Sequence, residues 1–375
     1  KGSNELFSFK RNVWKSFMAA DSVQFTVCTK TEGKWKAFKP FTIYVSRDRI
    51  DPWLSYRLIP PGYQGWMTMG LYQRNLESYS QKAIFRNSQA GGNCVNCHSY
   101  AGRKTDNMVF HARELYGGTI LVSNGTVEKL NTKTDSTISA LVYPYWHPSG
   151  DFIAFSVNAT KQVFMNHGPQ RIEVYDSASD VVVYDVKNHK LLFSDLIKTA
   201  DNFETFPSFS PDGKWLYFCS AKAVANMPEG YKESEYALKR IAFDAESKSF
   251  GSRVETVYDA PAEGKSVSFP RISPDGRFLA FTLHDYGNFS IWHKEADIIL
   301  MDLVSGKTDP CPELNSDDTD SYHSWSGNSR WLVFSSRRDD GLYTRPYISY
   351  IDSDGKAHKA FMLPQKNPRD FYRSL

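Results

Sequence analysis

The sequence is poor in cysteine, has no long hydrophobic run and shows no bias toward one sign of charge. Its 375 residues include five cysteines, an odd and sparse set that does not form the framework of a disulfide-stapled domain. The best apolar run, ADIILMDLV, is too short to cross a membrane. Acidic and basic residues are interspersed and the net charge is +3, so we expect neither a membrane span nor a nucleic-acid partner.

The motifs of common enzyme classes are also missing. The sequence contains no G-x-S-x-G nucleophile elbow, no G-x-x-x-x-G-K-(S/T) phosphate loop, no G-x-G-x-x-G motif and no H-E-x-x-H zinc helix. The acidic stretch NSDDTDSY lacks the glycine and the terminal glutamate of a calcium loop. No catalytic constellation is visible, so an enzymatic activity stays open and a non-enzymatic role is the main expectation.

What the chain does contain is an internal repeat. The segments YPYWHPSGDFIAFSVN (143–158), FPSFSPDGKWLYFCSA (206–221) and FPRISPDGRFLAFTLH (269–284) align, and YHSWSGNSRWLVFSSR (322–337) keeps their shape. Each begins with a short apolar run, continues through a turn and ends in an alternating run that is typical of a β-strand. In the Ser-Pro-Asp-Gly turn, Pro211 suits the first corner and Gly213 the position that needs a positive φ.

Further strands complete each repeat. Residues 181–196 and 296–309 each hold two apolar stretches around a turn, which gives four strands per unit, the size of a propeller blade. Similar character extends upstream through 94–113 and 117–132, where Asn124-Gly125 predicts a hairpin turn. Units are therefore visible near residues 94, 143, 206, 269 and 322. We predict an all-β fold, a β-propeller of four-stranded blades with five or six blades.

The first part of the chain does not follow the repeat. Residues 22–48 read as two or three strands, and YRLIPPGYQGWMTMGLYQRNLES reads as an irregular aromatic connector. We therefore predict a small N-terminal β-rich region at 1–93 and the propeller at 94–375. The chain begins with Lys1 rather than methionine, and we expect a mature product whose leader has been removed.

The stretch GGNCVNCHSY brings two thiols and an imidazole together as Cys94, Cys97 and His98. C-x-x-C-H is the attachment signature of c-type haem, in which both thiols add to the haem vinyl groups and the imidazole ligates the iron. A redox dithiol would instead begin a helix in a βαβ setting, and a structural zinc site needs four ligands. An ordinary thiol pair or a strained local disulfide is the remaining alternative. The sequence favours covalent haem c, and these alternatives stay open.

Candidates for a second iron ligand follow the motif. Met108 and His111 lie on the predicted next strand, where a spacing of three makes them face opposite sides, so at most one can reach the iron. Met108 shares its face with Phe110 and also suits a core position, and His111 also suits a hydrogen-bonded core histidine. Arg113 is a candidate partner for a haem propionate, or else a solvated surface arginine.

Other histidines carry weaker signals. His147 aligns with the serine of the Ser-Pro-Asp-Gly turns, so it is either a distal ligand from the next blade or, as we expect, a residue that caps its own turn. His284, His293 and His323 show no ligand spacing.

The repeat resembles the PD40 (WD40-like) repeat of TolB-type β-propellers over residues 94–365. The longer pattern of DPWLSYRLIPPGYQGW, MGLYQRNLE, NCVNCHSY and MVFHAR resembles a family of exported Bacteroidetes proteins, TolB-like propellers that carry a c-type haem motif. This resemblance implies the propeller fold and the haem, and it favours both Met108 and His111 as members of the site. The family has no settled activity, so the resemblance informs the fold more than the function.

Together these observations predict an exported haem c-binding propeller that serves electron transfer or another haem-linked role. Haem attachment needs reduced thiols in an oxidising compartment, which implies export to the periplasm or cell envelope, with outer-membrane anchoring through the removed leader as one expectation. The alternative is a haem-free TolB-like propeller that acts as a scaffold for an envelope protein partner. An enzyme with an open distal haem site is a third and weaker hypothesis.

Overall fold

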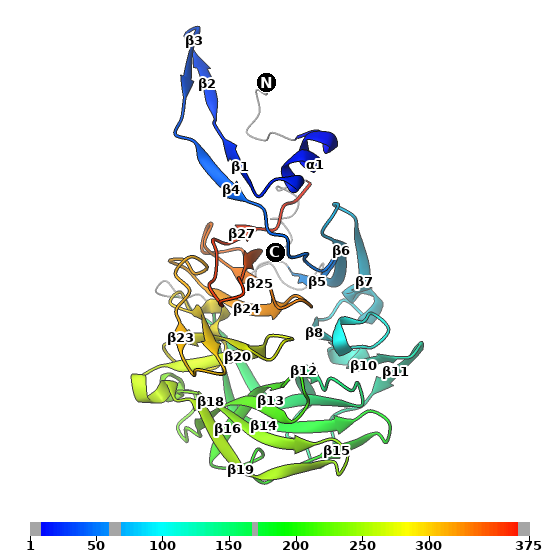
Figure 1. The fold of residues 1–375 in the computed structure, drawn as a ribbon. Helices are drawn as coiled ribbons and strands as arrows, with labels where there is room; N and C mark the ends of the chain where they lie inside the picture. The colour runs from blue at the N-terminus through cyan, green and yellow to red at the C-terminus, as the bar shows by residue number, and fades with distance from the viewer. Residues whose placement is uncertain (1–8, 60–68, 167–171, 367–375) are drawn as a thin grey trace. The chain divides into compact units, whose positions relative to one another are not determined.

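A computed structural model describes residues 9–59, 69–166 and 172–366 (Figure 1). The chain divides into two compact units, Lys1–Arg49 and Ile50–Leu375. We had predicted the division at 93/94, and the difference has a physical cause. Residues 50–93 pack with the sheet that follows them: Ser55 Oγ lies 2.9 Å from Tyr100 Oη, and the Val95 amide donates to Met69 Sδ at 3.2 Å. The segment 60–68, in the middle of the predicted connector, lies outside the described residues.

The described residues of the smaller unit, 9–49, form one helix and two antiparallel strand pairs. Its elements are α1 (Arg11–Ala19), β1 (Ser22–Phe25), β2 (Cys28–Thr31), β3 (Lys34–Ala37) and β4 (Phe41–Tyr44). Strand β1 pairs with β4, and β2 pairs with β3 as a hairpin whose turn at Glu32-Gly33 has both φ angles positive. The sequence predicted two or three strands here, so the strands are more numerous and shorter than expected, and the helix was not predicted.

The larger unit is built from successive antiparallel sheets. A three-stranded sheet comes first, with β5 (Trp53–Leu58), β6 (Gly70–Asn75) and β7 (Gln81–Arg86). The first four-stranded sheet contains β8 (Val95–Tyr100), β9 (Met108–Ala112), β10 (Gly118–Ser123) and β11 (Thr126–Leu130). The second contains β12 (Leu141–Trp146), β13 (Phe152–Phe164), β14 (Ile172–Asp185) and β15 (Lys190–Leu192).

Three more four-stranded sheets follow in the same strand order. The third contains β16 (Asn202–Phe209), β17 (Trp215–Lys222), β18 (Ala237–Asp244) and β19 (Ser249–Tyr258). The fourth contains β20 (Ser266–Ile272), β21 (Phe278–His284), β22 (Asp297–Asp302) and β23 (Thr308–Asp309). The fifth contains β24 (Asp320–Trp325), β25 (Trp331–Ser336), β26 (Arg345–Tyr350) and β27 (Phe361–Met362). The all-β prediction and the four-strand repeat are confirmed.

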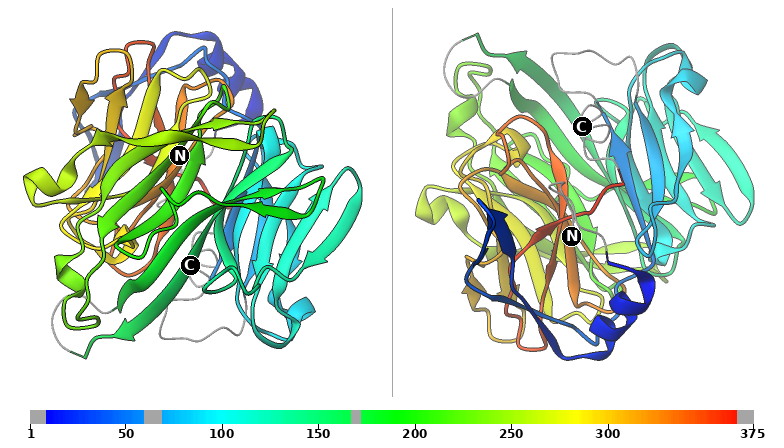
Figure 2. Two further views of the ribbon diagram at one scale, coloured as in Figure 1. Left: turned by 90° about the horizontal axis from the view of Figure 1, so that it is seen from below. Right: turned by 90° about the horizontal axis from the view of Figure 1, so that it is seen from above.

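The first strands of consecutive four-stranded sheets contact one another, β8 with β12, β12 with β16, β16 with β20 and β20 with β24. Figure 2 shows these sheets following one another from cyan through green and yellow to orange. Arg103 Nε donates to the carbonyl of Trp325 at 3.3 Å, and the Gly327 amide donates to Asp51 Oδ2 at 2.6 Å. The first bond links the fifth four-stranded sheet to the first four-stranded sheet, and the second links it to a residue just before the three-stranded sheet. The last sheet thus returns to the first ones, so the arrangement of the larger unit is propeller-like.

The repeated turns form as their sequence predicts. In the third sheet, Ser210 Oγ donates to Asp212 Oδ1 at 2.5 Å, and the same carboxylate oxygen accepts from the Lys214 amide at 3.1 Å. Gly213 has a φ of 75°, the left-handed conformation that glycine adopts without a steric penalty. The hairpin at Asn124-Gly125 likewise joins β10 to β11 with both φ angles positive.

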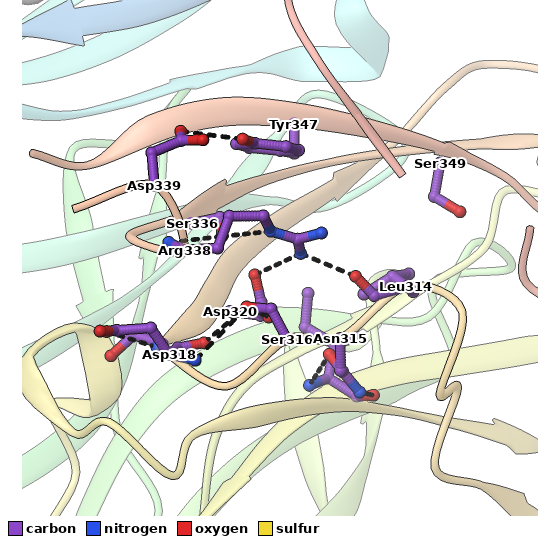
Figure 3. A network of polar contacts seen from close by, with 12 residues as sticks. Leu314, Asn315, Ser316, Asp318, Asp320, Ser336, Arg338, Asp339, Tyr347 and Ser349 are labelled. Atoms are coloured by element: carbon purple, nitrogen blue, oxygen red, sulfur yellow. Dashed lines mark hydrogen bonds and ion pairs between the residues drawn. The ribbon is translucent and has the colours of Figure 1, made fainter. Parts of the chain in front are cut away.

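An ion pair between Arg338 and Asp320 in the last four-stranded sheet also holds the loop that precedes this sheet (Figure 3). Arg338 Nη2 donates to Asp320 Oδ1 and to the carbonyl of Leu314, both at 2.7 Å, and its Nε donates to Ser336 Oγ at 2.8 Å. Asp320 is fully buried and its other oxygen accepts from Ser316 Oγ at 2.7 Å. Both carboxylate oxygens are therefore satisfied, as a buried charge requires.

Candidate haem-attachment site

The first strand of every four-stranded sheet carries a β-bulge at the same place. In β8 the pairing with β9 shifts between Asn96 and Ser99, so that Cys97 and His98 together oppose the single residue Phe110. The other four first strands shift in the same way, at 142–145, 205–208, 268–271 and 321–324. The C-x-x-C-H motif therefore begins just before a strand and its last two residues form the bulge on that strand, which differs from the helix start that a thioredoxin-type dithiol needs.

The bulge places one residue of each sheet in the left-handed conformation. These residues are Cys97, Tyr143, Phe206, Phe269 and Tyr322, with φ angles between 50° and 56°. The four aromatic members contact one another in order, with ring centroids 4.6 Å apart for Tyr143 and Phe206, 4.2 Å for Phe206 and Phe269, and 4.2 Å for Phe269 and Tyr322. We call these four residues the aromatic collar.

Cys97 is the one member of these five bulge residues that is not aromatic. Burial raises the pKa of both Tyr143 and Tyr322, and the charge of the Cys97 thiolate raises both further. Strand β8, which carries Cys97, contacts β12, which carries Tyr143. A small polarisable side chain thus stands where the other repeats have an aromatic ring.

His98 takes the second position of the bulge, where the equivalent residues are Pro144, Pro207, Pro270 and His323. Its ring lies edge-on to Tyr100, with centroids 6.1 Å apart, and the backbone of Ser55 on β5 acts to raise its pKa. Burial lowers the pKa of His98 to about 4, and the charge of Arg57 lowers it too. The imidazole is therefore neutral at pH 7, the form that ligates metals.

Cys94 directly precedes β8. Its carbonyl accepts from the Arg113 amide at 3.0 Å, which ties the start of the motif to the end of β9. Burial raises the pKa of the Cys94 thiol, while the guanidinium groups of Arg57 and Arg113 oppose that rise. Cys94 and Cys97 are both free cysteines, and each is only partly exposed.

Arg57 and Arg113 make the surroundings of the motif electropositive. Arg57 acts on Cys94, His98 and Tyr322, and Arg113 acts on Cys94. Within residues 9–59, 69–166 and 172–366, neither guanidinium forms an ion pair with a carboxylate. Because arginine matches the geometry of a carboxylate, these two groups are the candidates for binding an anionic substituent at the motif.

The structure separates the two predicted distal ligands. Met108 is 5% exposed and packs with Leu71, Val95 and Phe110, so it is a core residue. His111 is buried on the opposite face, where its Nδ1 is 2.9 Å from Thr119 Oγ1 and its ring lies 6.0 Å from that of Phe155. The two residues face opposite sides of β9, as predicted, and the assignment of either one as an iron ligand stays a prediction.

His147 has the hydrogen bonds of a turn residue. Its Nδ1 accepts from the Ser149 amide at 3.2 Å, and its Nε2 lies 3.1 Å from the carbonyl of Gly213 in the neighbouring sheet. This is the role that we expected for it. Among the described residues, no three histidine, cysteine, aspartate or glutamate side chains gather as a metal-binding group.

Sequence reasoning missed the aromatic collar and Arg57. The collar was visible in principle, because the motif cysteine aligns with the aromatic residue that opens every repeat, at 143, 206, 269 and 322. Arg57 carried no such signal, because the sequence of the three-stranded sheet does not align with the repeat that marks the four-stranded sheets.

Comparison with known proteins gives similarities of fold only. No protein-family model matches the chain, and no curated protein is significantly similar in sequence. Among solved structures, an oligogalacturonate lyase of Vibrio parahaemolyticus is 12% identical, with 92% of this chain and 86% of the lyase aligned and a TM-score of 0.46.

Two further structures are similar over smaller shares of their own length. For hydrazine synthase of Kuenenia stuttgartiensis the identity is 14%, the coverage is 71% of this chain and 65% of the synthase chain, and the TM-score is 0.41. For a puromycin-hydrolyzing peptidase of Mycobacterium tuberculosis the identity is 10%, the coverage is 92% of this chain and 52% of the peptidase, and the TM-score is 0.48. These similarities do not transfer an activity to the chain.

Proposed function

We propose that this protein is an exported haem c-binding propeller, in which Cys94 and Cys97 hold the haem through thioethers and His98 ligates its iron. The observation that carries this proposal is the state of the motif: two free thiols and a neutral imidazole sit together at a bulge beside the collar. When bound, the haem would supply one-electron transfer at its iron.

The residues present suit such a group. The His98 imidazole is neutral and lies near the backbone of Ser55, and a neutral imidazole is the form that ligates a metal. Arg57 and Arg113 offer two positive charges to the haem propionates, which extends the role that we predicted for Arg113. Tyr143 supplies aromatic surface on β12, the strand that contacts β8.

The TolB-like character of the repeats and the location in the periplasm or cell envelope belong to the same proposal. Haem c is attached after export, where the two thiols must be kept reduced until they react, so the motif and the compartment are chemically linked. Electron transfer to or from an envelope protein partner is the role that we assign to the haem.

The test is to produce the full chain in a host that exports it and attaches haem, and then to extract it with acid–acetone. We expect a Soret band that stays with the protein. The double variant Cys94→Ser/Cys97→Ser should lose the band, whereas Cys28→Ser, an exposed cysteine outside the motif, should keep it. Colourless protein with two titratable thiols in the motif would overturn the proposal and favour the haem-free scaffold.

A further inference from the structure

The smaller unit, Lys1–Arg49, leaves an unusual amount of apolar surface exposed. Of 23 large hydrophobic side chains exposed in the described part of the protein, ten lie between residues 9 and 49. They are Phe9, Val13, Trp14, Met18, Val27, Trp35, Phe38, Phe41, Ile43 and Tyr44. Helix α1 contains no buried residue, and all residues of β2 and β3 are exposed.

A small aromatic cluster gives the unit its internal packing. Phe17 of α1 lies 5.0 Å from Phe9 and 5.5 Å from Phe25 of β1, and Phe25 stacks on Phe41 of β4 at 5.5 Å between centroids. Trp14 and Met18 of the same helix stay about half exposed, with exposed fractions of 53% and 50%. The helix therefore keeps exposed apolar side chains beyond those that pack within the unit.

The hairpin of β2 and β3 has no core of its own. Lys30 is paired with Trp35 across the two strands, and Lys34 and Lys36 flank this tryptophan, whose exposed fraction is 58%. A two-stranded hairpin that buries no apolar face is marginally stable in water. We therefore expect the exposed tryptophan and lysines of this hairpin to contact another surface.

The net charge of the smaller unit indicates which kind of surface it would bind. Residues 1–49 contain ten lysine and arginine residues against four aspartate and glutamate residues, a net charge of +6. The rest of the chain carries −3, because the whole chain is +3. Among the described residues, the Lys and Arg side chains of α1 and the hairpin form no ion pair with a carboxylate. The positive charge of α1 and of the hairpin is thus not neutralised by neighbouring carboxylates, although Arg47 elsewhere in the unit pairs with Asp21 at 2.7 Å.

We propose that the smaller unit docks the protein on the surface of an anionic lipid bilayer. Segments that combine tryptophan and phenylalanine with lysine and arginine bind in the headgroup region of a bilayer. There the aromatic rings reach the boundary of the acyl chains and the cations contact the lipid phosphates. A bilayer needs no concave complementary site, which suits exposed side chains that are spread over a short helix and a hairpin. The inference stands independently of the haem.

Flotation of the full-length protein with vesicles tests this inference. We expect binding to phosphatidylcholine vesicles that contain about a third phosphatidylglycerol, little binding to phosphatidylcholine alone, and weaker binding as salt is raised. Lys30→Gln/Lys34→Gln/Lys36→Gln should reduce the partition coefficient at least about tenfold, since each juxtamembrane cation contributes several-fold. Trp14→Ser/Trp35→Ser should reduce it as well.

The matched control is Leu115→Ser/Val304→Ser, which removes two exposed apolar side chains of the larger unit, with exposed fractions of 82% and 88%. It should bind as the unaltered protein does. All altered residues are exposed, and circular dichroism checks that each variant is folded. Absence of binding to anionic vesicles, or binding that survives both the lysine and the tryptophan substitutions, would overturn the inference. Binding to an acidic protein without binding to vesicles would also overturn it.

Discussion

Cys97 occupies in the first four-stranded sheet the position that Tyr143 occupies in the second. Both residues open a β-bulge, and both have left-handed φ angles, 56° for Cys97 and 50° for Tyr143. The propeller-like repeat therefore supplies a fixed, strained backbone position near the aromatic collar, and the first sheet fills it with a thiol. The next residue of the bulge is a histidine only in the first and fifth sheets, at His98 and His323.

That pair provides a matched test of the role of His98. Both histidines are held neutral by burial, with a pKa of about 4 for His98 and about 3 for His323, and in each the backbone of the preceding sheet opposes that fall. We expect His98→Ala and His323→Ala to lower the free energy of unfolding by similar amounts, about 1–3 kcal/mol. Only His98→Ala should change the haem absorption spectrum. An identical spectral change in both variants would show that the effect is structural.

The position of Met108 leads to a different expectation. Its side chain is buried with Leu71, Val95 and Phe110, so Met108→Ala should lower the free energy of unfolding by about 2–4 kcal/mol through the cavity that it leaves. Urea unfolding measures this cost. The low-spin haem spectrum of the folded variant should persist, and its loss in folded protein would identify Met108 as the iron ligand after all. His111→Ala, measured in the same way, tests the other candidate.

Arg57 should control the reactivity of Cys94. Its charge opposes the rise in the Cys94 pKa that burial causes, so Arg57→Gln should raise that pKa further. Because the thiolate is the reactive form, alkylation of Cys94 by iodoacetamide at pH 8 should slow roughly two- to fivefold in haem-free protein. Arg49→Gln is the control for removal of an arginine outside the motif, and mass spectrometry of the peptide follows the reaction. An unchanged rate in Arg57→Gln would contradict the electrostatic role.

We expect Glu204 to make the stability of the fold depend on pH in the direction opposite to that of the buried histidines. Burial is the main cause that raises its pKa to about 7, from an ordinary value of 4.5. The folded protein thus favours the protonated carboxyl, and the stability that this group contributes is present below pH 4.5 and is lost as the pH rises through 7. Above pH 7, Glu204→Gln should therefore be more stable than the unaltered protein by up to about 3 kcal/mol, with no difference near pH 4.5.

Urea unfolding at several pH values measures the Glu204 effect. Glu229→Gln, a substitution at an exposed glutamate, is the control and should leave the pH dependence unchanged. A stability difference between Glu204→Gln and the unaltered protein that stays constant from pH 4.5 to 8 would contradict the account.

Sequence reasoning predicted those parts of the fold that local chemistry determines. Alternating apolar runs and the Ser-Pro-Asp-Gly turn specify a hairpin within a few residues, and Gly213 and Gly125 adopt the positive φ angles that their turns require. The place of Cys97 and His98 on a first strand followed from the same alignment. The all-β repeats were therefore readable without any tertiary information.

Long-range packing determined what the sequence did not reveal. Strands β5 to β7 lack the repeated turn, so their sheet was assigned to the N-terminal region, although Ser55 and Arg57 lie beside the motif. The aromatic collar depends on five bulges that meet only when the sheets assemble. Met108 and His111 were separable by face, but only the packed sheets show which neighbours each face meets.

The intact mass of protein that has been exported and matured tests the central claim most directly. The sample is alkylated with iodoacetamide under denaturing conditions before measurement. The account predicts that the mass increases by that of one haem, and that Cys94 and Cys97 stay unmodified while Cys28 is alkylated. A chain that carries no added haem mass, with Cys94 and Cys97 both alkylated, would contradict it.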